Sequence, residues 1–158
     1  MHKIKYKLFE KSCIDSTIIL DFFKKNDDAL IPHISERVNL FDYSNRLSEK
    51  AIHFTAFKNG KLVGILSLYF NQFPKFSFCP YFCVNKNYTG QSIGNTLLKM
   101  AIDYCILNNS FGIKLTVNKD NLYVIKFYKK NDFYSIEEGF YPNSDKKHLL
   151  MGKKLNER

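Results

Sequence analysis

The chain has 158 residues, of which 45% are hydrophobic and 16% are aromatic. This length and composition suit one buried core, so we expect a single domain over residues 1–158 with no disordered region. The formal net charge of +9 favours an anionic partner, but the lysines are scattered and form no long basic run. Nucleic acid is therefore the weaker interpretation, and a polyanionic small ligand or a plain solvated surface explains the charge as well.

The sequence also argues against a secreted protein, a membrane span and a metal site. Met1–Lys5 contains no apolar leader, and no stretch approaches the 18 apolar residues of a membrane span, so we expect a cytoplasmic protein without a membrane segment. Cys79 and Cys83 have a metal-like spacing, but no second pair of Cys or His ligands follows them. We therefore expect no metal site, and reduced, mostly buried thiols.

The first half of the chain predicts one strand, two helices and a hairpin. The strand covers residues 4–9, the helices cover 15–25 and 35–49, and the hairpin strands cover 52–57 and 62–70. Asn59-Gly60 between two alternating apolar runs is a strong hairpin signal. In the second helix, Val38, Phe41 and Leu47 are the expected inward positions.

The second half predicts strands that alternate with helices. Residues 76–84 form an apolar strand containing Pro80, which indicates an edge strand or a bulge because proline cannot donate to a ladder. A helix over 92–107, a strand over 113–117, a helix over 121–130, a strand over 133–136, a polar loop over 137–147 and a strand over 148–153 complete the chain. This order predicts an α/β fold with a mixed sheet and helices on both faces.

The segment Val84–Asn95 carries the strongest functional signal. A strand ends, a loop with Gly90 and Gly94 turns, and an amphipathic helix begins at once. Both glycines allow positive φ or a close backbone approach, and the hydroxyl of Ser92 can cap the helix or donate. Such a turn directs unpaired backbone N–H groups outward, where they can hold a pyrophosphate. The pattern lacks the Gly-Lys-Ser/Thr of a P-loop and the three glycines of a dinucleotide fingerprint, and an ordinary strand-to-helix connection is the alternative.

Together with a second motif downstream, this loop resembles the pattern of the GNAT superfamily of acetyl-CoA-dependent N-acetyltransferases. The family has a pyrophosphate loop of the form Arg/Gln-x-x-Gly-x-Gly/Ala, followed later by Asn-x-x-Ala-x-x-Phe-Tyr. The matching residues are Val84 and Tyr88 before the loop, Gly90, Ile93 and Gly94 in it, and Asn121, Val124, Phe127 and Tyr128 in the second motif. The resemblance covers approximately residues 51–133. Thr89 and Ser92 depart from it, because they replace the usual Arg or Gln and the first motif glycine.

The resemblance implies a fold, a co-substrate and a set of binding residues. The fold is a mostly antiparallel central sheet with helices on both faces and a splayed, V-shaped cofactor cleft, and the co-substrate is acetyl-CoA. The implied cofactor-binding residues are Phe82, Val84, Thr89, Gly90, Gln91, Ser92, Ile93, Gly94, Asn95 and Asn121. Asn121 would cap a helix, bind the pantetheine arm, or do both.

The chemistry needs an acid for the leaving thiolate and a base for the amine. Tyr128 matches the tyrosine that serves as the acid in many members, and a tyrosine that only fills the core is the alternative. The strand 76–84 contains no Asp or Glu, so the base is open among His53, Glu49 and water held by Ser77, Tyr81 or the backbone. A substrate amine of low pKa would need no dedicated base.

The sequence thus predicts an N-acetyltransferase that moves an acetyl group from acetyl-CoA to a primary amine of a small molecule, such as an amino sugar or another metabolite. A catalytically weak CoA-binding sensor or interaction module is one alternative, and a protein N-acetyltransferase is another. A homodimer is left open.

Overall fold

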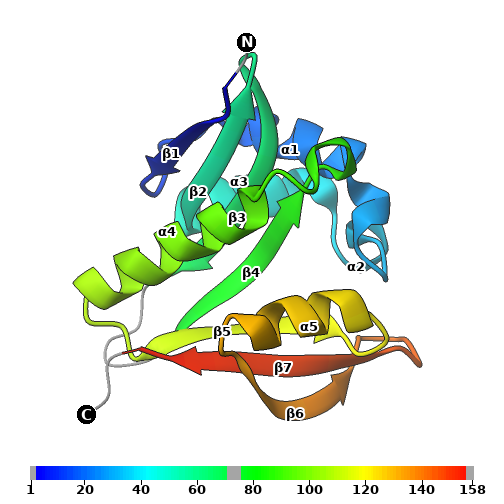
Figure 1. Cartoon of the computed structure of the whole chain (residues 1–158). Coiled ribbons are helices and arrows are strands. Elements are labelled where there is room, and N and C mark those ends of the chain that lie inside the picture. Colours follow the sequence, from blue (N-terminus) through cyan, green and yellow to red (C-terminus); the bar gives the residue numbers. More distant parts are fainter. Residues whose placement is uncertain (1–2, 71–75, 156–158) are drawn as a thin grey trace. The chain divides into compact units, whose positions relative to one another are not determined.

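Seven strands form one mixed sheet in the computed structural model, which describes residues 3–70 and 76–155 (Figure 1). The strand order is β1-β2-β3-β4-β5-β7-β6. The strands are β1 (Lys5–Phe9), β2 (Ile52–Lys58), β3 (Lys61–Tyr69), β4 (Ser77–Val84), β5 (Gly112–Asn118), β6 (Tyr134–Phe140) and β7 (Lys147–Lys154). The helices are α1 (Ser16–Lys25), α2 (Ile34–Arg37), α3 (Leu40–Lys50), α4 (Ile93–Leu107) and α5 (Leu122–Lys130), with short 3₁₀ turns η1 (Asp27–Ala29) and η2 (Lys86–Tyr88). β4 and β5 are parallel and the pairs β1–β2, β2–β3, β5–β7 and β6–β7 are antiparallel, which confirms the predicted class.

The chain forms two compact units. The first comprises Met1–Phe70 and Tyr81–Ala101, and the second comprises Asn71–Pro80 and Ile102–Arg158. β4 and α4 therefore each contribute residues to both units. The candidate anion loop belongs to the first unit, whereas Asn121 and Tyr128 belong to the second.

The hairpin of the first unit forms as the sequence predicts. Asn59 and Gly60 have φ angles of 53° and 75°, and Lys58 lies opposite Lys61 in the β2–β3 register. A two-residue turn with both central residues at positive φ matches the right-handed twist of the strands it joins. The turn thereby fixes the antiparallel register of β2 and β3.

Aromatic side chains fill the core of the first unit. The carboxylate of Asp15 accepts a hydrogen bond from the amide of Thr17 at 2.9 Å and caps α1, which buries one apolar face. On that face, the rings of Phe22 and Phe23 meet the ring of Tyr81 edge-on, with centroids 6.4 and 4.8 Å apart. Edge-on contacts of this kind add to the stability gained by burial.

Gly64 of β3 allows α4 to pack on the opposite side of the sheet in the first unit. Its neighbour Ile65 belongs to the core cluster that contains the buried residues of α1 and α3. Successive side chains in a strand point to opposite faces. A Cβ built on Gly64 would lie 3.1 Å from Cγ2 of Ile93 and 3.2 Å from Cδ1 of Leu97, both in α4. Helices therefore cover both faces of the strands in this unit.

The single helix predicted over residues 35–49 is wrong, because the chain breaks it into α2 and α3. Val38 is extended, with φ −144° and ψ 158°, and the side chain of Asn39 then accepts from the amide of Asp42 at 2.9 Å. This cap starts a new helix and resets the helical face. Phe41, expected to point inward, is consequently 60% exposed, whereas Leu47 is buried as predicted.

β4 is an internal strand, so the interpretation of Pro80 as the mark of an edge strand is wrong. The order of the sheet places β4 between β3 and β5. The parallel register with β5 covers Ser77 and Phe78, whose partners are Ile113 and Lys114. Pro80 follows these two residues, so its missing N–H interrupts neither pair.

β6 is longer than the sequence predicts. The residues from Glu137 to Phe140, expected in a polar loop, continue the strand and pair with β7. β6 is the last strand of the sheet, and nearly all its residues are exposed. An edge strand exposed on both faces accepts glutamates freely, so its polarity imitates that of a loop.

In the second unit, α5 covers one face of β5 and β7. Ile113, Leu115 and Val117 of β5 are buried, whereas Lys114 and Asn118 are half-buried and Thr116 is exposed. Nζ of Lys153 in β7 donates to the carbonyl oxygen of Asn131, the residue that ends α5, at 3.0 Å. Leu115, Met151 and Lys153 hence share the face that carries α5, because paired residues in a sheet point to the same side.

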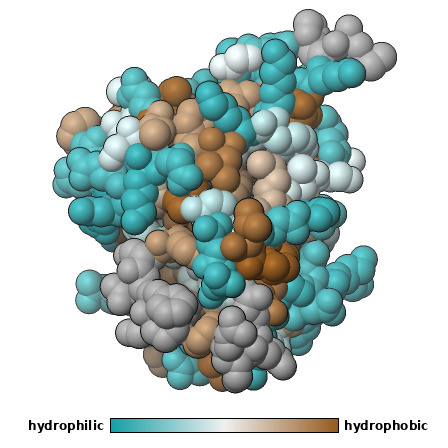
Figure 2. Space-filling view, turned by 90° about the vertical axis from the view of Figure 1, so that its left-hand side faces the viewer, coloured by the Kyte–Doolittle hydropathy of each residue, from teal (hydrophilic) through white to brown (hydrophobic). Residues whose placement is uncertain are grey.

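The cysteines are free, and Cys13 is exposed while Cys79, Cys83 and Cys105 are buried, which confirms the prediction of mostly buried thiols. Burial raises the pKa of Cys83 and of Cys105 to about 11. On the surface drawn in Figure 2, brown hydrophobic residues lie in small groups among teal hydrophilic ones. Among the described residues, no helix has the length and apolar character needed to cross a membrane. Over the same part of the chain, no three His, Cys, Asp or Glu side chains are grouped to hold a metal ion.

Candidate active site

The loop between β4 and α4 is held by its own polar groups. The amide of Asn85 donates to the carbonyl oxygen of Val63 at 2.8 Å, which fastens the end of β4 to β3. The side chain of Asn85 accepts from the amide of Asn87 at 2.9 Å and starts η2. The hydroxyl of Thr89 donates to the carbonyl oxygen of Lys86 at 3.1 Å. These hydrogen bonds fix the shape of the loop up to Gly90.

Two residues in left-handed conformations turn the chain into α4. Gly90 has φ +82° and Ser92 has φ +61°. The carbonyl oxygen of Ser92 accepts from the amide of Thr96 at 3.0 Å, so Ser92 closes the first turn of the helix. Ser92 stands where the GNAT pattern usually has glycine, and its positive φ gives the physical reason for glycine there. Gly94 lies inside α4 and does not use positive φ.

The start of α4 is open to solvent and is the candidate anion cradle. The first N–H groups of a helix have no intrahelical acceptor and carry the positive end of the helix dipole. A Cβ built on Gly90 would meet no atom within 4 Å. Gln91, Ser92 and Asn95 are exposed, and Gly94 is partly exposed. The local geometry therefore suits a diphosphate bound to main-chain amides.

The other predicted cofactor residues of the first unit lie on either side of this loop. Phe82 and Val84 are half-buried in β4, and Thr89 is exposed. Ile93 is 1% exposed and packs against Gly64, so its side chain is a core group that does not face a ligand. The first unit thus holds every predicted cofactor residue except Asn121.

In the second unit, Asn121 caps α5. Its side-chain oxygen accepts from the amide of Val124 at 3.1 Å, and its carbonyl oxygen accepts from the amide of Ile125 at 3.1 Å. The capping role that the sequence predicts is confirmed. Leu122 and Tyr123, which follow in the first turn, are 74% and 83% exposed.

Tyr128 lies on the inner face of α5 and is 5% exposed. Its ring contacts the rings of Phe127 and Phe133, with centroids 5.3 and 5.2 Å away. Its carbonyl oxygen accepts from the amides of Asn131 and Phe133 and closes the helix. The ring is therefore fixed by packing, which suits both a core tyrosine and a rigidly placed phenol.

The candidates for the general base have structural partners. His53 is 0% exposed, its Nε2 donates to the carbonyl oxygen of Leu47 at 2.9 Å, and its Nδ1 lies 2.9 Å from Oγ of Ser67. Burial lowers the pKa of His53 to about 4. A neutral imidazole inside the core, with both of its ring nitrogens hydrogen-bonded, is a structural group.

The remaining residues named for the base differ in exposure: Ser77 and Tyr81 are buried, whereas Glu49 is exposed. The hydroxyl of Ser77 lies 2.8 Å from that of Ser110 in a buried pair. Tyr81 is 2% exposed, and burial raises its pKa well above the usual value. Glu49 is exposed near the end of α3. Neither Ser77 nor Tyr81 is free to hold a catalytic water at the surface.

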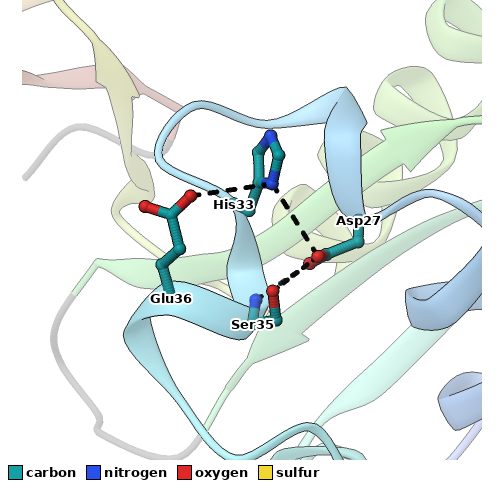
Figure 3. A network of polar contacts seen from close by, with 4 residues as sticks. All are labelled: Asp27, His33, Ser35 and Glu36. Carbon is teal, nitrogen blue, oxygen red and sulfur yellow. Dashed lines mark hydrogen bonds and ion pairs between the residues drawn. The ribbon is translucent and has the colours of Figure 1, made fainter.

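A polar network orders the segment after α1 (Figure 3). The carboxylate of Asp27 accepts from the amide of Ser35 at 2.8 Å and from its hydroxyl at 2.5 Å. Nδ1 of His33 lies 3.9 Å from Oδ2 of Asp27 and 3.6 Å from Oε1 of Glu36. The hydrogen bond from the Ser35 hydroxyl lowers the pKa of Asp27. Because that hydroxyl donates to a carboxylate and not to His33, the set is not a Ser-His-Asp nucleophile.

Sequence reasoning missed two residues that the structure brings forward. Gly64 lies against α4, and the only sequence signal for this close contact is its place inside an apolar strand. His148 was assigned no role, although its ring is packed over Gly139 in the second unit. His148 was expected only as the first residue of a strand that follows a polar loop, and no pattern indicated that its Nδ1 is buried.

Comparisons with known proteins agree with this geometry. The model of the acetyltransferase (GNAT) family matches residues 17–133. No significant match was found among curated protein sequences. The fold is similar to that of the ribosomal-protein-S18-alanine N-acetyltransferase from Escherichia coli, with 17% identity, a TM-score of 0.77, and coverage of 100% of this chain and 96% of that one.

Two other solved structures extend the likeness. One is the PaiA N-acetyltransferase from Thermoplasma acidophilum in complex with coenzyme A, with 18% identity, a TM-score of 0.74, and coverage of 96% of this chain and 99% of that one. The other is a nourseothricin acetyltransferase, with 17% identity, a TM-score of 0.62, and coverage of 68% and 66%. At such identities the structures support the fold, and the family model carries the assignment. The chain belongs to the acetyltransferase (GNAT) family.

Proposed function

We propose that the chain transfers the acetyl group of acetyl-CoA to a primary amine of a small molecule, such as an amino sugar or another metabolite. The anion cradle at the start of α4 is the observation that supports this most. It combines the positive φ angles of Gly90 and Ser92 with exposed residues at the start of a fifteen-residue helix. A pyrophosphate is the part of acetyl-CoA that such a turn would hold.

The cofactor contacts follow from the loop. The amides from Gly90 to Asn95 hold the pyrophosphate. Thr89 lacks the long donor that the family usually has, and its hydroxyl already bonds Lys86, so binding depends on main-chain amides with Gln91 beside them. Backbone groups of Phe82 and Val84 receive the pantetheine arm, and an amide of this stretch stabilises the developing oxyanion.

Tyr128 is the proposed acid. The amine nitrogen attacks the thioester carbonyl, the C–N bond forms, the C–S bond breaks, and the nitrogen releases one proton to water. The departing thiolate takes the phenolic proton of Tyr128, which solvent later restores. A phenol titrates near pH ~10, close enough to a thiol for this transfer to be efficient. The fixed ring of Tyr128, packed against Phe127 and Phe133, supports this role because a positioned acid is a faster one.

Both units belong, in this proposal, to one acetyltransferase domain. The family model supports this, because residues 17–133 include parts of each unit. The acceptor is proposed to be a small amine, recognised with help from the segment 26–50. Exposed or partly exposed carboxylates of Asp27, Asp28 and Glu36 in this segment would attract a cationic amine. A protein N-terminus is the competing acceptor, and the assay below distinguishes it.

The test has a binding arm and a turnover arm. Isothermal titration with acetyl-CoA should show saturable binding to the wild-type chain. Gly94→Val should weaken it at least tenfold, because the side chain blocks phosphate approach while the helix remains. Met100→Val, a neutral change farther along α4, is the control and should retain wild-type affinity. Unchanged affinity in folded Gly94→Val protein would contradict the cradle.

The turnover arm measures thiol release from acetyl-CoA with a panel of amino sugars, diamines and peptides. Release with the small amines supports the proposal. Release with peptides alone would identify a protein N-acetyltransferase. Tight binding without release from any acceptor would instead identify a CoA-binding sensor.

A further inference from the structure

The stretches of the first unit that lead to the anion cradle carry only positive charge. Residues 51–70 and 81–101, which include β2, β3 and the start of α4, contain no Asp or Glu. The lysines of these stretches are Lys58, Lys61, Lys86 and Lys99. The cradle itself, from Gly90 to Asn95, has no charged side chain. A diphosphate held there would therefore take a cationic partner from a neighbouring element.

Lys58, the last residue of β2, belongs to the sheet face that carries α4. Ala56 pairs with Gly64, and paired residues point to the same side of a sheet. A Cβ on Gly64 would lie 3.1 Å from Cγ2 of Ile93, the first residue of α4. Lys58 follows Ala56 by two residues, so its side chain points to this same face.

The register of β2 and β3 shifts between Ala56 and Phe57, but β2 keeps its alternation. The ring of Phe57 lies 6.3 Å from that of Phe9, which packs against the core on the α1 side of the sheet. Phe57 thus points away from α4, and Lys58 points toward it. Two residues of a strand span about 6.6 Å and paired Cα atoms are about 5 Å apart, so the Cα atoms of Lys58 and Gly64 are about 8 Å apart. The side chain of Lys58 therefore begins close to the first turn of α4.

The Lys58 side chain also contacts the loop that leads into the cradle. Its Nζ lies 5.5 Å from the centroid of the Tyr88 ring. Tyr88 is the last residue of η2 and comes two residues before Gly90. An ammonium group above an aromatic face is attracted by the ring. The contact keeps a flexible side chain beside the loop.

The other lysines near the cradle have different surroundings. Nζ of Lys86 lies 3.8 Å from Oδ2 of Asp28, so this charge is already paired. Lys61 lies opposite Lys58 at the hairpin and adds a like charge. Within the described residues, Lys58 forms no ion pair with a carboxylate. A surface of one charge sign attracts ligands of the opposite sign, and Lys58 is the cation held against the loop.

We propose that Lys58 binds the diphosphate of acetyl-CoA, a role that rests on the proposed function. Main-chain amides at the start of α4 hold the diphosphate, and Nζ of Lys58 donates to one of its oxygens. Charge-assisted hydrogen bonds of this kind are about twice as strong as neutral ones. Because the Tyr88 ring already orders the side chain, less conformational entropy is lost when the ligand binds.

Isothermal titration with acetyl-CoA at low ionic strength tests this role. Lys58→Gln should weaken binding about fivefold or more, because it removes the charge but keeps a polar side chain. Lys58→Arg keeps the charge and should bind within about twofold of the wild type. Lys24→Gln removes the same charge from an exposed position on α1, on the opposite face of the sheet, and should leave the affinity unchanged. Added salt should reduce the difference between the wild type and Lys58→Gln.

Dephospho-CoA, which keeps the diphosphate but lacks the 3′-phosphate, identifies the group that Lys58 binds. Lys58→Gln should weaken the binding of dephospho-CoA by the same factor as that of acetyl-CoA. A loss of affinity that appears only with the 3′-phosphorylated ligand would overturn the diphosphate role.

Circular dichroism checks that the variants are folded, and Lys58→Met, which keeps the apolar stem, replaces Lys58→Gln if that variant is unfolded. A folded variant without the charge that binds within about twofold of the wild type at low ionic strength overturns the role of Lys58. A Lys58→Arg protein that binds as weakly as Lys58→Gln would contradict binding through charge. A wild-type chain that binds no acetyl-CoA overturns the proposed function instead.

Discussion

Gly64 of β3 lies directly against Leu97 of α4. A Cβ on Gly64 would be 3.2 Å from Cδ1 of Leu97 and 3.1 Å from Cγ2 of Ile93, the first residue of the helix. Contacts this short force neighbouring groups to move. The missing side chain therefore sets how closely the first turns of α4, and with them the anion cradle, pack on the sheet of the first unit.

Gly64→Ala should reduce the free energy of unfolding by about 1–3 kcal/mol, because overpacking displaces α4. Leu97→Ala removes one of the opposing side-chain ends. In the double variant the loss should be clearly less than the sum of the two single losses, since the clash is relieved. Urea unfolding of all four proteins measures this coupling. Strict additivity would show that Gly64 does not set the packing of α4.

Ser92 should accept glycine and reject valine. Its φ of +61° is strained for any residue with a Cβ and most strained for a β-branched one. Ser92→Gly should leave stability unchanged or slightly raised, whereas Ser92→Val should lower it by about 1–2 kcal/mol. The side chain is exposed, so lost packing cannot explain the difference. Equal stability of the two variants in urea would mean that the turn relaxes to another conformation.

Tyr128→Phe should separate catalysis from packing. The ring contacts with Phe127 and Phe133 remain, but the transferable proton is lost. Turnover with an amine that the wild type acetylates should fall ~10²-fold or more while acetyl-CoA affinity changes little. A tyrosine that only fills the core would keep turnover within a small factor and lose about 1 kcal/mol of stability. Thiol release and isothermal titration on the same preparations distinguish the two.

His53 should make the first unit sensitive to acid. Burial lowers its pKa to about 4 from the usual 6.5, so the unfolded chain binds a proton that the folded chain excludes. The stability from this group is complete above about pH 6.5 and is lost as the pH falls toward 4. Between pH 7.5 and 5 the loss should be about 2 kcal/mol.

The comparison protein for that measurement is His53→Gln, which can still donate to the carbonyl of Leu47 and accept from Ser67 but does not titrate. The difference in unfolding free energy between the two proteins should narrow as the pH falls from 7.5 to 5. A difference that is constant with pH would show that His53 is not buried in its neutral form.

The sequence by itself determined the elements whose signals are local. Asn59-Gly60 requires positive φ at two successive residues and so specifies the hairpin, and Asn121 caps α5 through its own third neighbour. The spacing of Gly90, Ser92 and Gly94 before an amphipathic helix likewise predicted the turn that leads from β4 into α4. Backbone conformations and caps of this kind depend on a few consecutive residues, so a pattern suffices to read them.

Only the tertiary structure decided the features that depend on distant neighbours. Pro80 indicates an edge strand or a bulge, yet β4 is internal, and the sequence does not say which strands lie beside it. Glu137 and Glu138 read as loop, but pairing with β7 makes them strand. His53, a candidate base in the sequence, is a core group because the fold places Leu47 and Ser67 within hydrogen-bond distance of its ring. The ring of His148 has room only because Gly139, on the neighbouring strand, has no side chain. Burial and unmet hydrogen bonds arise from the whole packing, so no local pattern predicts them.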